Sequence, residues 1–171
     1  SEMCIRDRKI NTYIFNRDTV DIMISDLMNH GIKHKNGNHV GKTIIFAQNK
    51  RHAKYIIERF DVLYPQYKGA FCKLVVCDEP YAEKNLEDFK KPDEYPFITV
   101  TVDMLETGVD VPEITNLVFA KKVYSRIKFE QMIGRGTRLC ENLFGEGRDK
   151  KEFYIFDYTV SYTHLRAHET R

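Results

Sequence analysis

Long apolar runs and paired cysteines are both missing from this 171-residue chain. No apolar run approaches the roughly 18 residues that a membrane-spanning helix needs, so we expect no membrane contact. No secretory signal is visible either. The four cysteines show neither a C-x-x-C spacing nor the density of a disulfide scaffold, which indicates reduced thiols in a cytoplasmic protein.

Charge of one sign is also scarce, because 27 Lys and Arg residues face 25 Asp and Glu residues, for a net charge of +2. Such a balance says nothing about nucleic acid by itself, so any basic binding surface must be local. The histidines His30, His34, His39 and His52 are too irregularly spaced for a metal cluster, and no cysteine stands at ligand spacing from them. We therefore expect no metal site, with His34 and His39 in a solvated linker.

The two ends of the chain have no amphipathic period that ties them to the neighbouring sequence. Residues 1–8 and 160–171 resemble translated sequencing-adapter read-through, and such segments are left out of fold reasoning. Real but frayed termini are the alternative. If the adapter interpretation is right, the natural gene continues in both directions and the chain is a fragment. Its expected parts are an N-terminal helix with a linker at 9–41 and one domain at 42–159.

Short apolar runs alternate with helical patterns through the body of the chain. The runs typical of buried strands are 43–47, 73–77, 97–102, 116–120 and 153–157. Each run is continuously apolar rather than alternating, which indicates that both faces of the sheet are covered. The alternation of strands and helices predicts an α/β fold, with a doubly wound, mainly parallel sheet of about five to six strands and helices on both faces.

An amphipathic helix should precede this sheet. Its apolar stripe lies within residues 20–28, Asp18 or Thr19 is the expected N-cap, and Gly31 is expected to close it. After the first strand, Asn49 is the expected cap of a second amphipathic helix.

Gln131, Arg135 and Arg138 form the most informative group in the chain. If residues 131–138 are helical, these side chains stand four and three positions apart on one face. Because the arginine fork is always charged and binds phosphate oxygens bidentately, the stripe suits a polyphosphate. Two glycines in the same segment cost roughly 1 kcal/mol each relative to alanine, which predicts close backbone approach or a bend. A solvated basic helix is the alternative.

A second polar segment leaves the third strand at its carboxyl end, where ligands bind in open parallel sheets. In this segment Gly108 permits close backbone approach. Asp110 is suited either to accept a hydrogen bond from a ribose hydroxyl or to hold an arginine. Such Gly-x-Asp-x-Pro turns are often structural, but together with the arginine segment this one predicts a two-part nucleotide surface.

The sequence contains no complete phosphate-binding loop. The Gly-Lys-Thr triplet at 41–43 reads like the end of a Walker A motif, but Gly37 stands one residue too close, and the triplet opens a strand rather than a helix. The Asp-Glu pair at 78–79 is followed at once by Pro80, so it does not provide a magnesium-binding pair in strand context. We expect that the chain cannot assemble the first half of an ATP site.

Three segments resemble motifs of superfamily 2 helicases and translocases. Residues 43–49 are similar to motif IV, residues 103–110 to motif V and residues 131–138 to motif VI. Their order and spacing match the second RecA-like domain of that superfamily over about residues 40 to 158. The similarity to the motor of type I restriction endonuclease R subunits is closest at 104–112, 131–139 and 150–158.

The resemblance implies roles at a nucleotide site. Arg138 would be an arginine finger on the γ-phosphate, with Arg135 as its partner on the phosphates. Gln131 would help to sense the γ-phosphate. Gly108 and Asp110 would lie beside the nucleotide, with Asp110 near its ribose.

The resemblance also implies contact with nucleic acid and with further protein parts. Gln48, Asn49 and Thr101 would face the nucleic-acid backbone, although Val102 replaces the threonine that many relatives carry. In the full-length parent, a missing N-terminal RecA-like lobe would hold most of the ATP and Mg²⁺, and this chain alone would hold neither. DNA and restriction-modification subunits would be further partners. Two alternatives remain: a non-catalytic α/β module that binds nucleic acid or a partner, and a lobe of a helicase unrelated to restriction.

Overall fold

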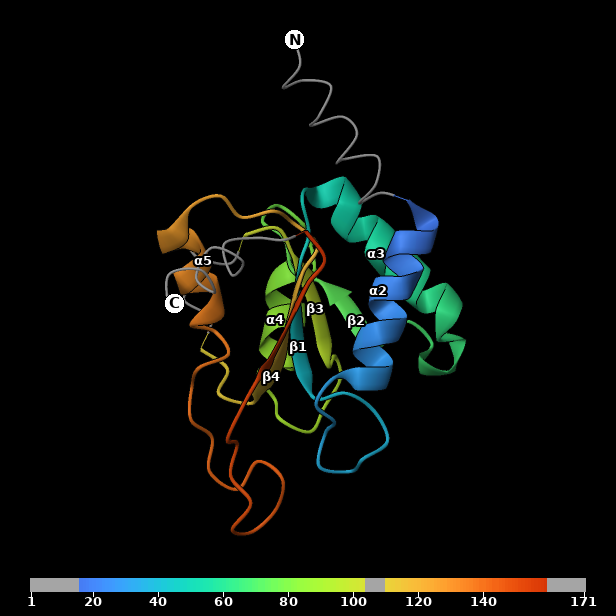
Figure 1. The fold of residues 1–171 in the computed structure, drawn as a ribbon. Helices are drawn as coiled ribbons and strands as arrows, with labels where there is room; N and C mark the ends of the chain where they lie inside the picture. The colour runs from blue at the N-terminus through green and yellow to red at the C-terminus, as the bar shows by residue number, and fades with distance from the viewer. Residues whose placement is uncertain (1–15, 104–109, 160–171) are drawn as a thin grey trace.

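The computed structural model of the chain describes residues 16–103 and 110–159 (Figure 1). The terminal segments expected at 1–8 and 160–171 therefore lie outside the described residues, and so does Gly108. None of the described helices is long and apolar enough to cross a membrane.

Five strands form one parallel sheet in the order β2-β3-β1-β4-β5. The strands are β1 Lys42–Phe46, β2 Cys72–Leu74, β3 Ile98–Thr101, β4 Ile114–Phe119 and β5 Tyr154–Asp157. The central strand is β1, where Ile45 is in register with Val100 of β3 and Val118 of β4. The expected parallel sheet is confirmed, with every strand close to its apolar run.

Helices cover both faces of this sheet, as the continuous apolar strands predicted. The helices are α2 Arg17–His30, α3 Lys50–Leu63, α4 Ala82–Phe89 and α5 Arg126–Ile133, with a short 3₁₀ helix η1 at Pro65–Tyr67. Two separate buried clusters show the division: α2 and α3 pack on one face, and α4 and α5 pack on the other (Figure 1). Neighbouring side chains of β1 pack into opposite clusters, Ile44 into the one with α4 and α5 and Ile45 into the one with α2 and α3. The fold is therefore doubly wound.

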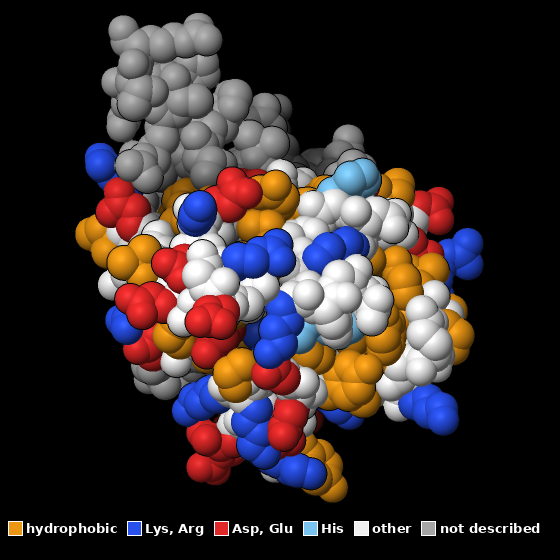
Figure 2. Space-filling view, turned by 90° about the horizontal axis from the view of Figure 1, so that it is seen from below, with side chains coloured by type: hydrophobic (Ala, Val, Ile, Leu, Met, Phe, Trp, Pro, Cys, Tyr) orange, Lys and Arg blue, Asp and Glu red, His pale blue; other side chains and the backbone are white. Residues whose placement is uncertain are grey.

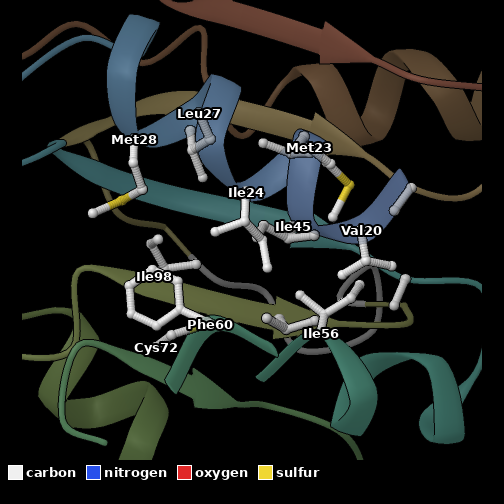
Figure 3. Close-up of a cluster of buried hydrophobic side chains, with 14 of the residues drawn as sticks. Val20, Met23, Ile24, Leu27, Met28, Ile45, Ile56, Phe60, Cys72 and Ile98 are labelled. Atoms are coloured by element: carbon white, nitrogen blue, oxygen red, sulfur yellow. The ribbon is translucent and has the colours of Figure 1, made fainter. Parts of the chain in front are cut away.

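The predicted apolar stripe of α2 is fully used in the first cluster (Figure 3). Its buried members are Val20, Met23, Ile24, Leu27 and Met28. Full burial of an aliphatic side chain of this size contributes about 1.5–3 kcal/mol. The helix ahead of the sheet is thus an integral part of the folded core.

Three helix ends were predicted from the sequence, and two of these predictions are confirmed. Asn49 caps α3 as predicted, because its Oδ1 accepts a hydrogen bond from the backbone N–H of His52 at 2.8 Å. Gly31 closes α2, and a Cβ there would lie 2.6 Å from the Leu27 carbonyl oxygen. The predicted N-cap of α2 is wrong. Asn16 holds that position, and its side chain accepts from the N–H of Asp18 at 2.8 Å.

The expectation of a solvated histidine linker between α2 and β1 is also wrong. An antiparallel bridge between Lys33 and Val40 folds this segment back on itself. The ring of His39 is then buried against Phe97, with the ring centroids 4.3 Å apart, and it stacks on His34. Local polarity predicted exposure, whereas packing against a distant aromatic side chain determines the burial.

Lys42 opens β1, as predicted when the Walker A interpretation was rejected. Its Nζ donates hydrogen bonds to the carbonyl oxygens of Glu94 and Pro96, each at 2.7 Å, and lies 4.5 Å from the ring centroid of Phe97. The side chain is almost completely buried, and this burial lowers the pKa of Lys42 to about 8. A lysine held in this way is not available to bind a phosphate.

Candidate functional site

The candidate nucleic-acid residues gather at the carboxyl end of the two central strands. Phe46, the last residue of β1, is in register with Thr101, the last residue of β3. The backbone N–H of Ala47 donates to the Thr101 carbonyl oxygen at 2.7 Å, which places Gln48 and Asn49 just beyond the same edge. Two adjacent parallel strands thus bring these three predicted residues to one end of the sheet.

Their accessibility differs. Asn49 is exposed and Gln48 is half-buried. The Oδ1 atom of Asn49 is engaged in capping α3, which leaves its amide nitrogen for an external group. Thr101 is only 1% exposed, so its side chain lacks the open surface that the expected backbone contact requires.

Figure 2 shows the opposite end of the molecule, where the loop between α2 and β1 lies. Lys and Arg side chains are interspersed there with Asp and Glu side chains. This mixed surface agrees with the nearly balanced composition, so a polyanion could bind at this end only through a local group of cations. Within the part of the chain that the structure describes, no group of three or more His, Cys, Asp or Glu residues could hold a metal ion.

The arginine segment is helical only in part. Ser125 caps α5 through its Oγ atom, and the helix ends at Ile133. After that point the backbone tightens: the N–H of Arg135 bonds to the carbonyl three residues earlier at 3.2 Å, and Gly136 does the same at 2.8 Å. The expectation of one helical face over 131–138 is therefore wrong. Gln131 lies in the helix, Arg135 lies in the turn, and Arg138 lies beyond it.

The expectation of a close backbone approach is confirmed at Gly136. A Cβ atom at this position would lie 2.5 Å from Cδ2 of Phe153, the residue just before β5. Gly134 is less constrained, since a Cβ atom there would come no closer than 3.3 Å to another heavy atom. Gly136 lets the turn that carries Arg135 sit directly on the start of the last strand.

Two ion pairs connect α5 and its turn to the predicted motif V segment. Nζ of Lys128 lies 3.0 Å from Oδ2 of Asp103, and Nη2 of Arg138 lies 3.3 Å from Oδ2 of Asp110. Both pairs are partly exposed, so each contributes about 0–1 kcal/mol to folding. Of the two roles predicted for Asp110, the structure shows the one in which it holds an arginine.

The remaining candidate residues surround this contact. Gln131 is exposed on α5, and Arg135 is half-buried one turn before Arg138. The structure brings Arg138 and Asp110 into direct contact. Gln131 and Arg135 are close to Arg138 along the chain, in α5 and in the turn that follows it.

Sequence reasoning missed the lysines of the site. Nζ of Lys121, just beyond β4, donates to the Val102 carbonyl oxygen at 3.2 Å. Burial, followed by the nearby charge of Lys128, lowers the pKa of Lys121. The position of Lys121 after a strand end was the signal that could have pointed to it. Lys128 lies on α5 and carried no comparable signal.

Comparisons with known proteins identify the family of the chain. Residues 19–140 match the family described as the helicase conserved C-terminal domain. The chain is 39% identical over 137 residues to the EcoKI endonuclease subunit of a type I restriction enzyme from Escherichia coli strain K12. It is 30% identical over 171 residues to the corresponding EcoAI subunit from Escherichia coli. These matches cover 75% and 96% of this chain but 11% and 20% of the relatives, so the chain spans a small part of their length.

A solved structure of a type I restriction enzyme subunit has a similar fold. It is a fragment assigned to an HsdR subunit of a type I restriction enzyme from Vibrio vulnificus YJ016, with a TM-score of 0.76 and 27% identity. The match covers 94% of this chain and 30% of that one. With its five-stranded RecA-like sheet, the chain belongs to the helicase conserved C-terminal domain family and is homologous to the endonuclease subunits of type I restriction enzymes.

Proposed function

We propose that this chain is the second RecA-like lobe of an ATP-dependent DNA translocase, the motor of a type I restriction endonuclease R subunit. The observation that carries the proposal is the pair formed by Arg138 and Asp110 at 3.3 Å, which joins the motif VI and motif V segments at one place. In this function Arg138 reaches the γ-phosphate, Arg135 supports it, and Gln131 senses the γ-phosphate. Gly108, outside the described residues, and Asp110 lie beside the nucleotide.

The exposed character of the ion pair supports this role. Arg138 is 57% and Asp110 54% exposed in their side chains, so little free energy holds the guanidinium in place. A triphosphate offers several charged oxygens in the bidentate geometry that arginine prefers. Arg138 can therefore exchange the carboxylate for a nucleotide and stabilise the charge that develops on the transferred phosphoryl group.

The rest of the ATP site belongs to a partner lobe. ATP and Mg²⁺ are held mainly by the N-terminal RecA-like lobe, because Lys42, the lysine of the only Walker-like triplet, is committed to two carbonyl oxygens inside the described fold. Three large apolar side chains stand exposed around α5, namely Tyr124, Ile127 and Leu139. An exposed apolar surface of this kind suits a partner domain. Further restriction-modification subunits complete the assembly.

DNA passes over the carboxyl end of the central strands in this proposal. Asn49 offers an exposed amide, and Gln48 lies next to it. Both contacts position the backbone without reading sequence. Thr101 contributes to the contact only if the strand end rearranges, because its side chain is buried.

Phosphate release by an R subunit that contains this lobe tests the proposal. With saturating DNA, Arg138→Ala should lower turnover by about 10³-fold or more, the range found for arginine fingers, with DNA affinity nearly unchanged. Arg148→Ala, which removes an exposed arginine from the loop before β5, is the matched control and should retain turnover.

The isolated chain should release no phosphate under the same conditions. Clear turnover by the isolated chain, lost in Arg138→Ala, would contradict the assignment as one half of an ATP site. Equal turnover of the Arg138→Ala and Arg148→Ala R subunits would instead favour a non-catalytic binding module.

A further inference from the structure

A groove of about 440 Å³ lies beside the edge strand β2 and is lined by residues of α4 and of the turn that leads into β2. The amide nitrogen of Asn85 donates to the Leu74 carbonyl oxygen at 2.9 Å, which holds α4 against β2. In the strand order, β2 lies at one edge of the sheet, whereas β4 and β5, which α5 connects, lie at the other. The groove is therefore separate from the site around Arg138.

Three lysines give the groove a positive charge. Lys68 and Lys84 are exposed and Lys73 is half-buried. Among the residues that the structure describes, none of the three forms an ion pair, although Asp61 acts on Lys73 at longer range. The groove also contains Asp88, whose carboxylate lies 3.4 Å from Nζ of Lys91, outside the lining. Three lysines against the carboxylates of Asp61 and Asp88 leave the groove a net positive charge, which favours an anion.

Protection of an exposed sheet edge accounts for only one of these lysines. A lysine on an edge strand discourages pairing with other chains, and Lys73 in β2 fits that purpose. Lys68 lies in a left-handed turn and Lys84 lies on α4, so neither blocks the edge of the strand. A ligand explains all three positions.

Two tyrosines add aromatic surface to the same groove. Tyr81 is 71% exposed, and its ring makes no contact with another ring among the described residues. Tyr95 is 48% exposed, and its ring packs against those of Tyr67, Phe71 and Phe97, at 5.6 Å between centroids and nearly perpendicular in the case of Phe97. Exposed aromatic rings next to a net positive charge are the combination that binds bases and phosphates of unpaired strands.

We propose that the groove beside β2 binds single-stranded nucleic acid, with Lys68, Lys73 and Lys84 on the phosphates and Tyr81 and Tyr95 stacked on bases. An acidic peptide would use the lysines but leave the open face of Tyr81 without a function. A duplex would present phosphates but no free base faces. The groove would be a second contact with nucleic acid if the contact proposed around Asn49 also forms, but binding in the groove does not depend on that contact.

Fluorescence anisotropy of the full 171-residue chain with a labelled oligothymidylate of about twelve nucleotides tests the phosphate contacts. At low salt, Lys68→Gln with Lys84→Gln should weaken binding about tenfold. The same variant should lower the slope of log affinity against log salt by about 1.4, because two phosphate contacts are lost at about 0.7 each. Arg148→Gln with Lys151→Gln carries the same loss of charge at exposed positions near β5, at the other edge of the sheet, and should change affinity less than about twofold.

The tyrosine contact is tested separately. Tyr81→Ser should weaken binding about fivefold or more, since stacking contributes about 1–3 kcal/mol per base, whereas Tyr81→Phe should bind like the original chain. Absence of binding by the original chain, equal losses in the two lysine variants, or unchanged affinity of Tyr81→Ser would each overturn the proposal. So would displacement of the oligonucleotide by a polyglutamate peptide at lower concentration than by unlabelled oligonucleotide. Each variant is used only if its circular dichroism melting curve matches that of the original chain.

Discussion

Nη2 of Arg138 lies 3.3 Å from Oδ2 of Asp110, so the proposed arginine finger already has a carboxylate partner within its own lobe. The contact joins the segment that follows α5 to the segment that precedes β4. Because both side chains are more than half exposed, the pair is a contact that can be exchanged rather than a structural anchor.

Removing either member of this pair should leave the fold intact. For the isolated chain, we expect Arg138→Ala and Asp110→Asn each to change the free energy of unfolding by less than about 1 kcal/mol, because water screens exposed ion pairs. Urea unfolding followed by circular dichroism measures the change. Arg148→Ala provides the baseline for an exposed arginine. A loss of several kcal/mol would show that the pair is structural and that a turnover defect in Arg138→Ala is a folding defect.

Gly136 should tolerate substitution poorly. In Gly136→Ala the new Cβ would meet the Phe153 ring at 2.5 Å, and overpacking of this kind costs about 1–3 kcal/mol. Gly134→Ala is the matched control. A Cβ there would lie 3.3 Å from the Gln131 carbonyl oxygen, a tight contact but a much longer one than 2.5 Å, so Gly134→Ala should cost clearly less than Gly136→Ala. The midpoints of urea unfolding compare the two variants, and the double variant Gly136→Ala with Phe153→Leu should recover part of the loss. Equal effects at the two glycines would contradict the close approach.

Lys42 should make stability depend on pH in the alkaline range. Burial lowers the pKa of Lys42 to about 8 in the folded chain from 10.5 in the unfolded chain, so between these values the unfolded state binds more protons. Stability contributed by this group should therefore rise with pH above about 8, by at most about 1.4 kcal/mol per pH unit.

The unfolding free energy of the original chain and of Lys42→Met between about pH 8 and pH 9.5 isolates this effect. Other groups, such as Lys121 and Lys150, whose pKa values burial also lowers, contribute equally to both proteins. The original chain should show the steeper increase. Parallel pH profiles would mean that Lys42 keeps its proton in the folded state throughout this range.

The cap of α2 gives a local prediction. Asn16→Ala removes the side-chain acceptor for the N–H of Asp18 and should cost about 1 kcal/mol. Thr19→Ala, at the position that the sequence favoured as a cap, should cost less, because Thr19 lies inside the helix. Thermal unfolding of the two variants decides between the two caps.

The strands and the two-sided helical cover were predictable because they depend on local apolar patterns. The runs around Ile45 and Val100 are continuously apolar, and such runs are typical of parallel strands that are buried on both faces. The N-cap of α2 was not predictable, since several residues near its start can serve as caps and only the backbone geometry selects Asn16. The buried position of His39 depends on Phe97, which is far away in sequence.

The candidate site was predictable at the level of segments but not of contacts. The arginine spacing pointed to Arg138, and the turn chemistry pointed to Asp110, but their pairing depends on where α5 ends. The expectation of one continuous helix over residues 131–138 failed because the backbone tightens into a turn after Ile133, where the two glycines lie. Lys128 belongs to no motif, and its ion pair with Asp103 depends on how α5 packs beside the end of β3.

The two ion pairs of the site also have a mechanical consequence. Lys128 within α5 contacts Asp103, whereas Arg138, beyond the turn that follows α5, contacts Asp110. Release of Arg138 alone would leave the attachment at Asp103 in place. A ligand that draws Arg138 away would therefore free Asp110, while the contact between Lys128 and Asp103 does not depend on Arg138.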